Sequence, residues 1–355
     1  MRKILLCLTA VLFVAVLLAA CSGGGGGGEV DDSARPEAED DGIVRIYFIP
    51  KNLGNSYFQA LSSGFYDAIS ELGEENFEYV YTGPETAEAT SQLEYVREAT
   101  RKGADAIFIA ANSNEALNDA FDEARAAGVR VYVINQDIPG GEAHRDAAIM
   151  PVNFDTVGAA QLALMAEQIG HKGRFAILSA TADAPDQNFW IASMKEELAN
   201  NPAYARMELV ALVYGDDQAE KSAAEMEALL AEYPDLNGVV APTTVGITAA
   251  CRVVQSAGVV GKVKVTGLGL PSEMAEFVKA GVCESFQLWN PPYEGYIGAY
   301  MAWAEANGTF SPEPGATFSA GKLGDYTVLP NGQILTLETP MLYDASNIDM
   351  YSVLF

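Results

Sequence analysis

The chain has 355 residues, and its 48 acidic and 21 basic side chains give a formal net charge of −27 at neutral pH. This length is enough for two domains with separate cores. The excess of negative charge argues against a nucleic-acid partner, which needs basic surface to displace counterions. The chain has only two histidines, which argues against a zinc site, a catalytic triad or a histidine general base.

The N-terminus has the organisation of a lipoprotein signal. Arg2 and Lys3 precede an apolar run at residues 4–20, which ends in "LAA" before Cys21. A basic start, an apolar middle and small residues before a cleavage point are typical of a signal peptide. "LAAC" resembles the bacterial lipobox, which implies removal of residues 1–20, a diacylglyceryl group on Cys21 and attachment to a membrane outside the cytoplasm. The alternative is an uncleaved membrane helix, because the run is near the lower length limit for spanning.

Residues 21–42 contain mainly Gly, Ser, Pro and acidic residues. Such a segment cannot bury enough apolar surface to offset its ordering entropy, so it predicts a disordered tether. Two further cysteines, Cys251 and Cys283, lie in the body of the chain. In an oxidising compartment they form either a disulfide or two isolated buried thiols, and the sequence does not distinguish these.

From residue 43 onward, short apolar runs alternate with amphipathic segments. The runs predict ten strands at residues 43–50, 77–83, 104–111, 129–136, 147–153, 174–180, 207–215, 236–242, 263–270 and 284–290. The segments predict helices at residues 56–72, 87–102, 115–127, 156–169, 187–200, 219–233, 245–257, 272–280 and 293–307. This alternation is typical of parallel sheets with both faces covered. A break in the rhythm at residues 138–158 divides the series, so we expect an α/β fold with two doubly wound domains.

The C-terminal part departs from this pattern. "YTVL" and "QILTL" flank "PNG" at residues 326–337, which predicts a β-hairpin. The tail remains partly apolar up to Phe355, and we expect it to dock on the body.

Enzyme signatures are scarce in this sequence. It has no GxGxxG after the first strand, no phosphate-binding loop and no GxSxG elbow. We therefore expect no cofactor, no metal and no catalytic activity. A pair of catalytic carboxylates cannot be recognised by counting acidic residues, so a surface sugar-modifying enzyme using Asp137 or Asp186 remains an alternative.

Polar and aromatic side chains gather where the predicted strands end, which is where open α/β sheets bind ligands. Amides and carboxylates suit vicinal hydroxyl groups, and flat rings cover the apolar face of a sugar. Each residue alone also fits a turn, a helix start or the core. The recurrence of the pattern predicts a sugar site formed by Asn55, Tyr57, Phe58, Asn112, Asn135, Asp137, Asp186, Gln187, Asn188, Trp190, Thr243, Trp289 and Asn290.

Several of these stretches are similar to a known family. "KNLGNSYF", "AILSATADAPDQNFWIASMK", "VVAPTTVGITAA" and "VTGLGLPSEMAEFVKAG" resemble the class I sugar-binding proteins of ABC importers, and the rhamnose-binding branch most. The resemblance extends over residues 43–355 and implies two Rossmann-like lobes joined by a three-segment hinge. It places the crossings near residues 150–152, 290 and 320–323. The N-terminal lobe would hold residues 43–150 and 291–320, and the C-terminal lobe residues 151–290 and 321–355.

The resemblance also bears on the ligand. Asn55, Tyr57 and Phe58 match the family's contact after the first strand. Asn135 stands where many relatives have an Asp that grips sugar hydroxyls, and Gly269 where ribose-type relatives have another. These two departures weaken the case for ribose.

The autoinducer-2-binding branch is the main alternative within the family. Lys51, Asp186, Gln187 and Pro242 fit its pattern, which adds Lys51 and Pro242 to the expected site. Thr244 replaces an Ala of that branch, and Asn135 replaces its Asp. We therefore expect rhamnose or a related deoxysugar, since the additional hydroxyl partners suit a polyol ring.

The implied mechanism is closure of the two lobes around a monosaccharide, followed by docking on the membrane permease of an ABC importer. We expect a monomer that acts without covalent chemistry. A role as the partner of a chemoreceptor would differ only in what the closed form docks to.

Overall fold

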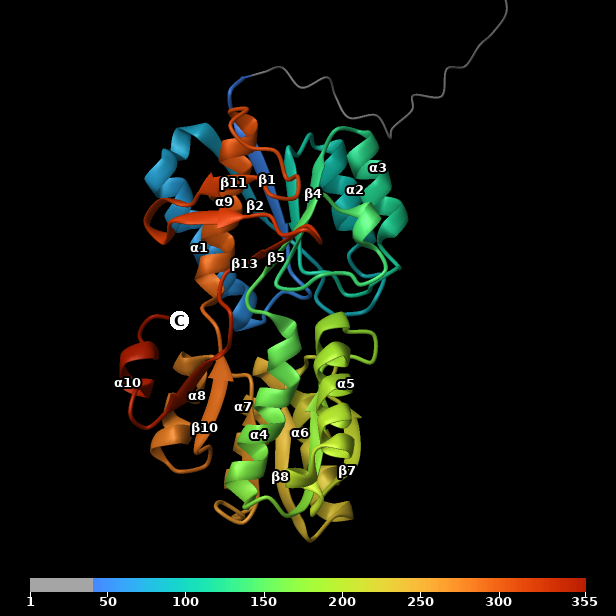
Figure 1. Ribbon diagram of the computed structural model, residues 1–355, viewed down its shortest axis with the longest axis vertical. Coiled ribbons are helices and arrows are strands. Elements are labelled where there is room, and N and C mark those ends of the chain that lie inside the picture. The colour runs from blue at the N-terminus through green and yellow to red at the C-terminus, as the bar shows by residue number, and fades with distance from the viewer. Residues whose placement is uncertain (1–40) are drawn as a thin grey trace, which may run out of the picture. The chain divides into compact units, whose positions relative to one another are not determined.

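The structure is a computed structural model that describes residues 41–355 (Figure 1). The expected signal peptide, Cys21 and all but the end of the expected tether lie outside the described residues. Among the helices of residues 41–355, none combines the length and the apolar character needed to cross a membrane.

The first sheet has six parallel strands in the order β13-β5-β4-β3-β1-β2. Strand order therefore reverses between β1 and β3, which is the ligand-binding point of a doubly wound sheet. We call this sheet and its helices the first lobe. The strands are β1 (Val44–Ile49), β2 (Phe77–Tyr81), β3 (Ala106–Ile109), β4 (Arg130–Ile134), β5 (Ala147–Met150) and β13 (Gln333–Leu335).

Helices cover both faces of this sheet. Helices α1 (Ser56–Leu72) and α9 (Pro291–Ala306) pack on one face, and α2 (Leu93–Arg101) and α3 (Asn118–Ala126) on the other. Alternate residues of β1 explain the arrangement, because Phe48 joins the α1 and α9 core while Ile49 joins the α2 and α3 core. Strand β1 therefore contributes to both cores, and β3 in the centre of the sheet is buried along its whole length, as the continuous apolar runs predicted.

The second sheet repeats the plan. Its parallel strands β6 (Gly173–Ser179), β7 (Met207–Tyr214), β8 (Leu236–Ala241) and β9 (Lys264–Gly267) have the order β7-β6-β8-β9. Strand β10 (Ser285–Leu288) continues this series through a single parallel bridge between Leu268 and Gln287. It also pairs antiparallel with β14 (Met341–Asp344). Strand order reverses between β6 and β8, so this sheet, in what we call the second lobe, has its own ligand-binding point.

Two helix pairs belong to the second sheet. Helix α4 (Val157–Ile169) packs against α5 (Pro185–Asn200), and α6 (Ala219–Glu232) packs against α7 (Thr244–Ser256). Helices α8 (Pro271–Lys279) and α10 (Ile348–Tyr351) lie against each other near the C-terminus (Figure 1). The predicted α/β fold with two doubly wound sheets is confirmed.

The third connection between the lobes lies later in the chain than expected. Strand β13 registers in parallel with residues 148–150 of β5, and Ile334 is fully buried there. Residues 321–335 therefore stay with the first sheet, and the chain crosses between Leu335 and Met341. The assignment of residues 321–355 to the second lobe was wrong in this part, because burying Ile334 against β5 outweighs the short hairpin.

The predicted hairpin at residues 326–337 is also wrong. Strand β12 (Asp325–Thr327) pairs antiparallel with β11 (Thr317–Ser319), which precedes it. The "PNG" segment forms a turn, with a backbone hydrogen bond from Gly332 N to Leu329 O, and it directs the chain into β13. The turn motif thus marked the change of direction and the strand that follows it correctly, but not the partner of that strand.

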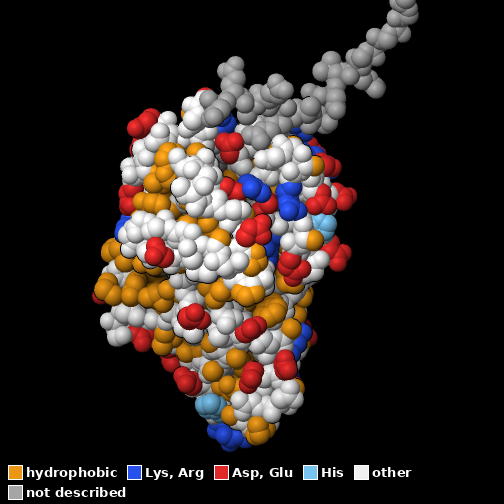
Figure 2. Space-filling view, turned by 45° about the horizontal axis from the view of Figure 1, so that its top comes forward, with side chains coloured by type: hydrophobic (Ala, Val, Ile, Leu, Met, Phe, Trp, Pro, Cys, Tyr) orange, Lys and Arg blue, Asp and Glu red, His pale blue; other side chains and the backbone are white. Residues whose placement is uncertain are grey.

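Acidic side chains are spread over the face drawn in Figure 2, and Lys and Arg side chains are fewer there. This agrees with the formal charge of −27. Cys251 and Cys283 are both buried in the second lobe as free thiols.

Candidate functional site

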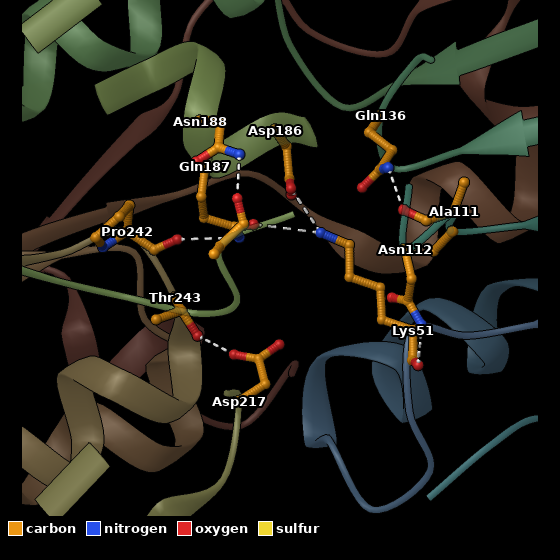
Figure 3. Close-up of polar contacts among 12 residues, drawn as sticks. Lys51, Ala111, Asn112, Gln136, Asp186, Gln187, Asn188, Asp217, Pro242 and Thr243 are labelled. Atoms are coloured by element: carbon orange, nitrogen blue, oxygen red, sulfur yellow. Dashed lines mark hydrogen bonds and ion pairs between the residues drawn. The ribbon is translucent and has the colours of Figure 1, made fainter. Parts of the chain in front are cut away.

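The carboxyl ends of β1 and β6 are joined by a buried ion pair. Lys51 follows β1 in the first lobe, and Asp186 lies in the first turn of α5 in the second lobe. The Lys51 Nζ and Asp186 Oδ1 atoms are 2.6 Å apart, and their side chains are 4% and 2% exposed (Figure 3). The ligand-binding points of the two sheets therefore face each other in this structure.

A cavity lies around this pair, with about 360 Å³ of space between the atoms, part of it open to solvent. Its wall combines polar groups and aromatic rings from both lobes, as small-molecule sites do. The predicted residues in the wall are Lys51, Asn55, Tyr57, Phe58, Asn135, Asp186, Gln187, Trp190, Pro242, Thr243 and Trp289. Asp217, Thr244, Leu268 and Leu288 complete it and were not among the predicted contacts.

The aromatic side of the cavity is built from interlocking rings. The ring centroids of Trp190 and Trp289 are 5.8 Å apart, and those of Tyr57 and Trp289 are 6.5 Å apart in an edge-to-face arrangement. Trp289 Nε1 donates a hydrogen bond to Tyr57 Oη at 2.6 Å. These rings are buried and also line the cavity. For each of these residues the sequence left core residue and ligand contact as alternatives, but in this structure one ring can serve as both.

Tyr57 in turn donates to a buried carboxyl group that sequence reasoning missed. The Tyr57 hydroxyl lies 2.6 Å from Glu294 Oε1, and Glu294 is fully buried at the start of α9. Burial raises the pKa of Glu294 well above its ordinary value, and the Tyr57 hydrogen bond offsets only part of this. The neutral acid is therefore favoured behind the aromatic wall. In the sequence, Glu294 has the ordinary signature of an acidic residue in a helix first turn.

Backbone contacts fix the position of Lys51. Asn112 Nδ2 donates to the Lys51 carbonyl at 2.9 Å, and its own backbone N–H donates to Gln92 Oε1 at 2.8 Å. Gln92 Nε2 also donates to the carbonyls of Pro50 and Ala110, each at 2.8 Å. The loop after β1 is thus tied to the end of β3, which holds Lys51 at the ligand-binding point.

Two polar atoms of the cavity wall are fully buried and lack hydrogen-bond partners among the described residues. They are the Asn135 Oδ1 acceptor and the Trp190 Nε1 donor, and both are buried. Asn135 also has a left-handed backbone with a φ of 72°, a conformation that Asn tolerates better than most residues. Unpaired buried groups are rare, so a donor and an acceptor in one cavity indicate a place for a polar ligand.

Four predicted residues do not line this cavity. Asn112 lies behind Lys51, and Asn188 is exposed with its Nδ2 donating to the Ala182 carbonyl. Asn290 directly precedes α9. Asp137 accepts hydrogen bonds from Arg145 through both oxygens at 2.6 Å and from Gln333 at 2.7 Å. Its carboxylate is thus fully engaged in holding β13 at the edge of the first sheet, which explains why it is not available in the cavity.

Within residues 41–355, no group of three or more His, Cys, Asp or Glu side chains is placed to hold a metal ion. Asp186 is paired with Lys51 and Asp137 with Arg145, so the two carboxylates considered for acid–base chemistry are engaged in ion pairs. The arrangement suits reversible binding of a neutral polar ligand.

Comparison with known proteins agrees with this geometry. A family model described as periplasmic binding protein domain matches residues 46–309. An ABC transporter solute binding protein from Clostridium phytofermentas, solved with bound L-rhamnose, is 32% identical. It covers 88% of this chain and 99% of its own, with a TM-score of 0.81.

Two further proteins are similar over much of the chain. A sugar ABC transporter structure from Actinomyces odontolyticus is 40% identical, covers 87% of this chain and 97% of its own, and has a TM-score of 0.68. A D-ribose/D-allose-binding protein of Pseudomonas aeruginosa is 27% identical over 227 residues, which is 63% of this chain and 70% of that protein.

Proposed function

The chain belongs to the periplasmic binding protein domain family, and from this premise we propose that it binds L-rhamnose or a related deoxysugar for an ABC importer. It is a sugar-binding protein of an ABC transporter and not an enzyme. The main support for this ligand is the cavity between the lobes. It lies in a chain that is 32% identical to a protein solved with bound L-rhamnose.

The cavity wall supports a deoxysugar in particular. Leu268, Leu288 and the ring of Trp289 supply apolar surface for a methyl group. Asn135, Gln187 and Thr243 supply amide and hydroxyl groups for the ring hydroxyls. A hexose with a hydroxymethyl group would lose hydrogen bonds to water against the leucines, and such unpaired polar groups are unfavourable.

Binding works through lobe closure in this proposal. Lys51 and Asn55 come from the first lobe, and Asp186 and Thr243 from the second. A ligand that contacts both sets favours the closed form, because only closure satisfies all of its contacts together. The closed lobes then dock on the permease subunits.

The location of the protein follows from the family and the N-terminal sequence. A periplasmic binding protein domain works outside the cytoplasm. We propose that Cys21 carries the lipid anchor and that residues 22–42 tether a monomeric binding domain near the permease, which raises its effective concentration there. Metabolic labelling with a fatty acid, lost in Cys21→Ser, tests the anchor.

Isothermal titration calorimetry of the purified body, residues 41–355, tests the ligand. The panel is L-rhamnose, L-fucose, D-ribose, D-allose and autoinducer-2. We expect L-rhamnose or L-fucose to bind most tightly and to raise the thermal unfolding temperature. Preferential binding of autoinducer-2 or D-ribose would refute the deoxysugar assignment, and binding of none would refute the sugar site. Uptake of the bound sugar in a deletion strain separates transport from chemosensing.

A further inference from the structure

We infer that Asp217 contacts the ligand and that its carboxyl group recognises one particular hydroxyl group of the sugar. This inference rests on the proposed function, since it assigns a specificity-determining role within the same cavity. Asp217 lies in the loop after β7, away from the strand pair where order reverses. It nevertheless lines the cavity and is 7% exposed.

The backbone of this loop is held in an unfavourable conformation. Asp216 and Asp217 both have a φ of 53°, in the left-handed region. Such a conformation in a residue other than glycine costs about 1–3 kcal/mol and persists only where the surroundings impose it. Hydrogen bonds from Gly215 N to Ser179 O and from Asp216 N to Ala180 O impose it here, both at 2.9 Å. The loop is thus tied to the end of β6, and this brings Asp217 to the cavity.

The two consecutive aspartates have different surroundings. Asp216 is half-exposed and pairs with Lys221. Asp217 accepts a hydrogen bond from Thr243 Oγ1 through its Oδ1 at 2.5 Å (Figure 3). Its Oδ2 has no hydrogen-bond partner in the part of the chain that the structure describes. One oxygen is therefore positioned by the protein, and the other is available to a ligand.

The electrostatic surroundings support a role toward a hydroxyl group. Burial raises the pKa of Asp217, and the nearby negative charge of Asp186 adds to this, while the Thr243 hydrogen bond and Lys51 oppose it. A carboxyl group with a raised pKa takes the neutral form more easily and then donates as well as accepts a hydrogen bond. A sugar hydroxyl group also donates and accepts. It can therefore donate to Asp217 when the carboxyl group is ionised and accept from it when the carboxyl group is neutral.

A purely structural role would be to satisfy Thr243 and to shape the start of α6. The two roles are separated by a cycle that pairs a change in the protein with a change in the ligand. The protein variant is Asp217→Gly, which removes the side chain and suits a φ of 53°. Asp216→Gly is the matched control, because it has the same φ and its side chain lies outside the cavity wall. The ligands are L-rhamnose and its 2-, 3- and 4-deoxy analogues, measured by calorimetry.

We expect Asp217→Gly to weaken L-rhamnose binding about 10- to 100-fold, the usual effect of losing a hydrogen bond to an ionisable group. The analogue that lacks the hydroxyl group contacted by Asp217 should bind the parent protein more weakly than L-rhamnose does, by a similar factor. The same analogue should bind Asp217→Gly as tightly as it binds the parent. Asp216→Gly should keep the affinity and the ranking of the parent. Thermal unfolding should show that both variants remain folded. Should Asp217→Gly fail to fold, Asp217→Asn replaces it, with a smaller loss confined to the same hydroxyl.

Two results would overturn the inference, and a third changes only the sugar with which the cycle is run. If the parent protein binds L-rhamnose and every analogue loses the same factor in Asp217→Gly as L-rhamnose does, Asp217 is structural and the proposed function stands. If the parent binds no L-rhamnose but another sugar of the panel, the cycle is repeated with monodeoxy analogues of that sugar and is judged by the same criterion. If no sugar binds, the proposed function and this inference both fail.

Discussion

Breaking the ion pair between Lys51 and Asp186 should impair ligand binding more than removing both charges. The pair joins the two lobes and is almost entirely buried. In the proposed mechanism each group is hydrated by solvent in an open form, and closure transfers both groups into the cavity. Lys51→Met leaves the Asp186 carboxylate without its cation, and Asp186→Asn leaves the Lys51 ammonium without its anion. The double variant leaves neither charge.

The magnitude follows from the distance and the burial. At 2.6 Å and an effective dielectric constant of about 20, the attraction between the two charges is about 6 kcal/mol. Desolvation of both ions cancels much of this, so the intact pair contributes little to closure. An unpaired buried charge, however, costs about 3–5 kcal/mol, which corresponds to about a 150- to 5,000-fold loss of ligand affinity. The double variant avoids that penalty and loses only direct ligand contacts.

Calorimetry of the parent, the two single variants and the double variant with one sugar measures the coupling directly. We expect the double variant to bind more tightly than the product of the two single losses predicts, by a factor of about 30 or more. Lys221→Met is a matched control, because Lys221 forms an exposed ion pair with Asp216 outside the cavity. Losses that multiply without coupling would show that the charges act independently and that the pair does not assist closure.

Three further predictions concern stability. Glu294 has a raised pKa from burial, so its contribution should fall as pH rises above about 4.3, where the unfolded chain loses its proton first. Thermal unfolding of Glu294→Gln between pH 5 and 7 should therefore vary less with pH than that of the parent, and an equal dependence would contradict the assignment. A Cβ on Gly64 would lie 1.8 Å from the Pro292 carbonyl oxygen, so Gly64→Ala should lower the free energy of unfolding in urea by about 1–3 kcal/mol or more. Asp137→Asn should lower it by about 3–5 kcal/mol, because a buried guanidinium loses its anion, while sugar affinity changes less than about threefold in calorimetry.

The fold was predictable because its signals are local. The first ten strands were short apolar runs, nine of them followed by an amphipathic segment, and all ten are present in the structure. The C-terminal strands were less predictable. Strand β13 has only three residues, and its partner β5 lies about 180 residues earlier in the sequence. A turn motif specifies where the chain bends, but burial against a distant strand decides what pairs with it.

The candidate site was predictable to the extent that it lies at strand ends. Residues after β1, β6 and β8 line the cavity as expected. Asp137 also follows a strand, yet its ion pair with Arg145 turns its carboxylate to a structural role. Asp217 was missed because "GDDQ" has the composition of an ordinary turn. Asp217 reaches the cavity through the left-handed backbone of Asp216 and Asp217 and through hydrogen bonds to the end of β6. Both features arise only in the folded chain.

The chain crosses between the lobes a second time between β10 and α9, and this crossing lies next to the cavity. Trp289 lines the cavity in the segment that leaves β10, and Glu294 is buried five residues later in the first turn of α9. The Tyr57 hydroxyl joins them, since it accepts from Trp289 Nε1 and donates to Glu294 Oε1. A ligand that packs against Trp289 therefore presses on a ring whose position is fixed relative to α9. Because α9 belongs to the first lobe and β10 to the second, these hydrogen bonds join the two lobes directly behind the cavity wall.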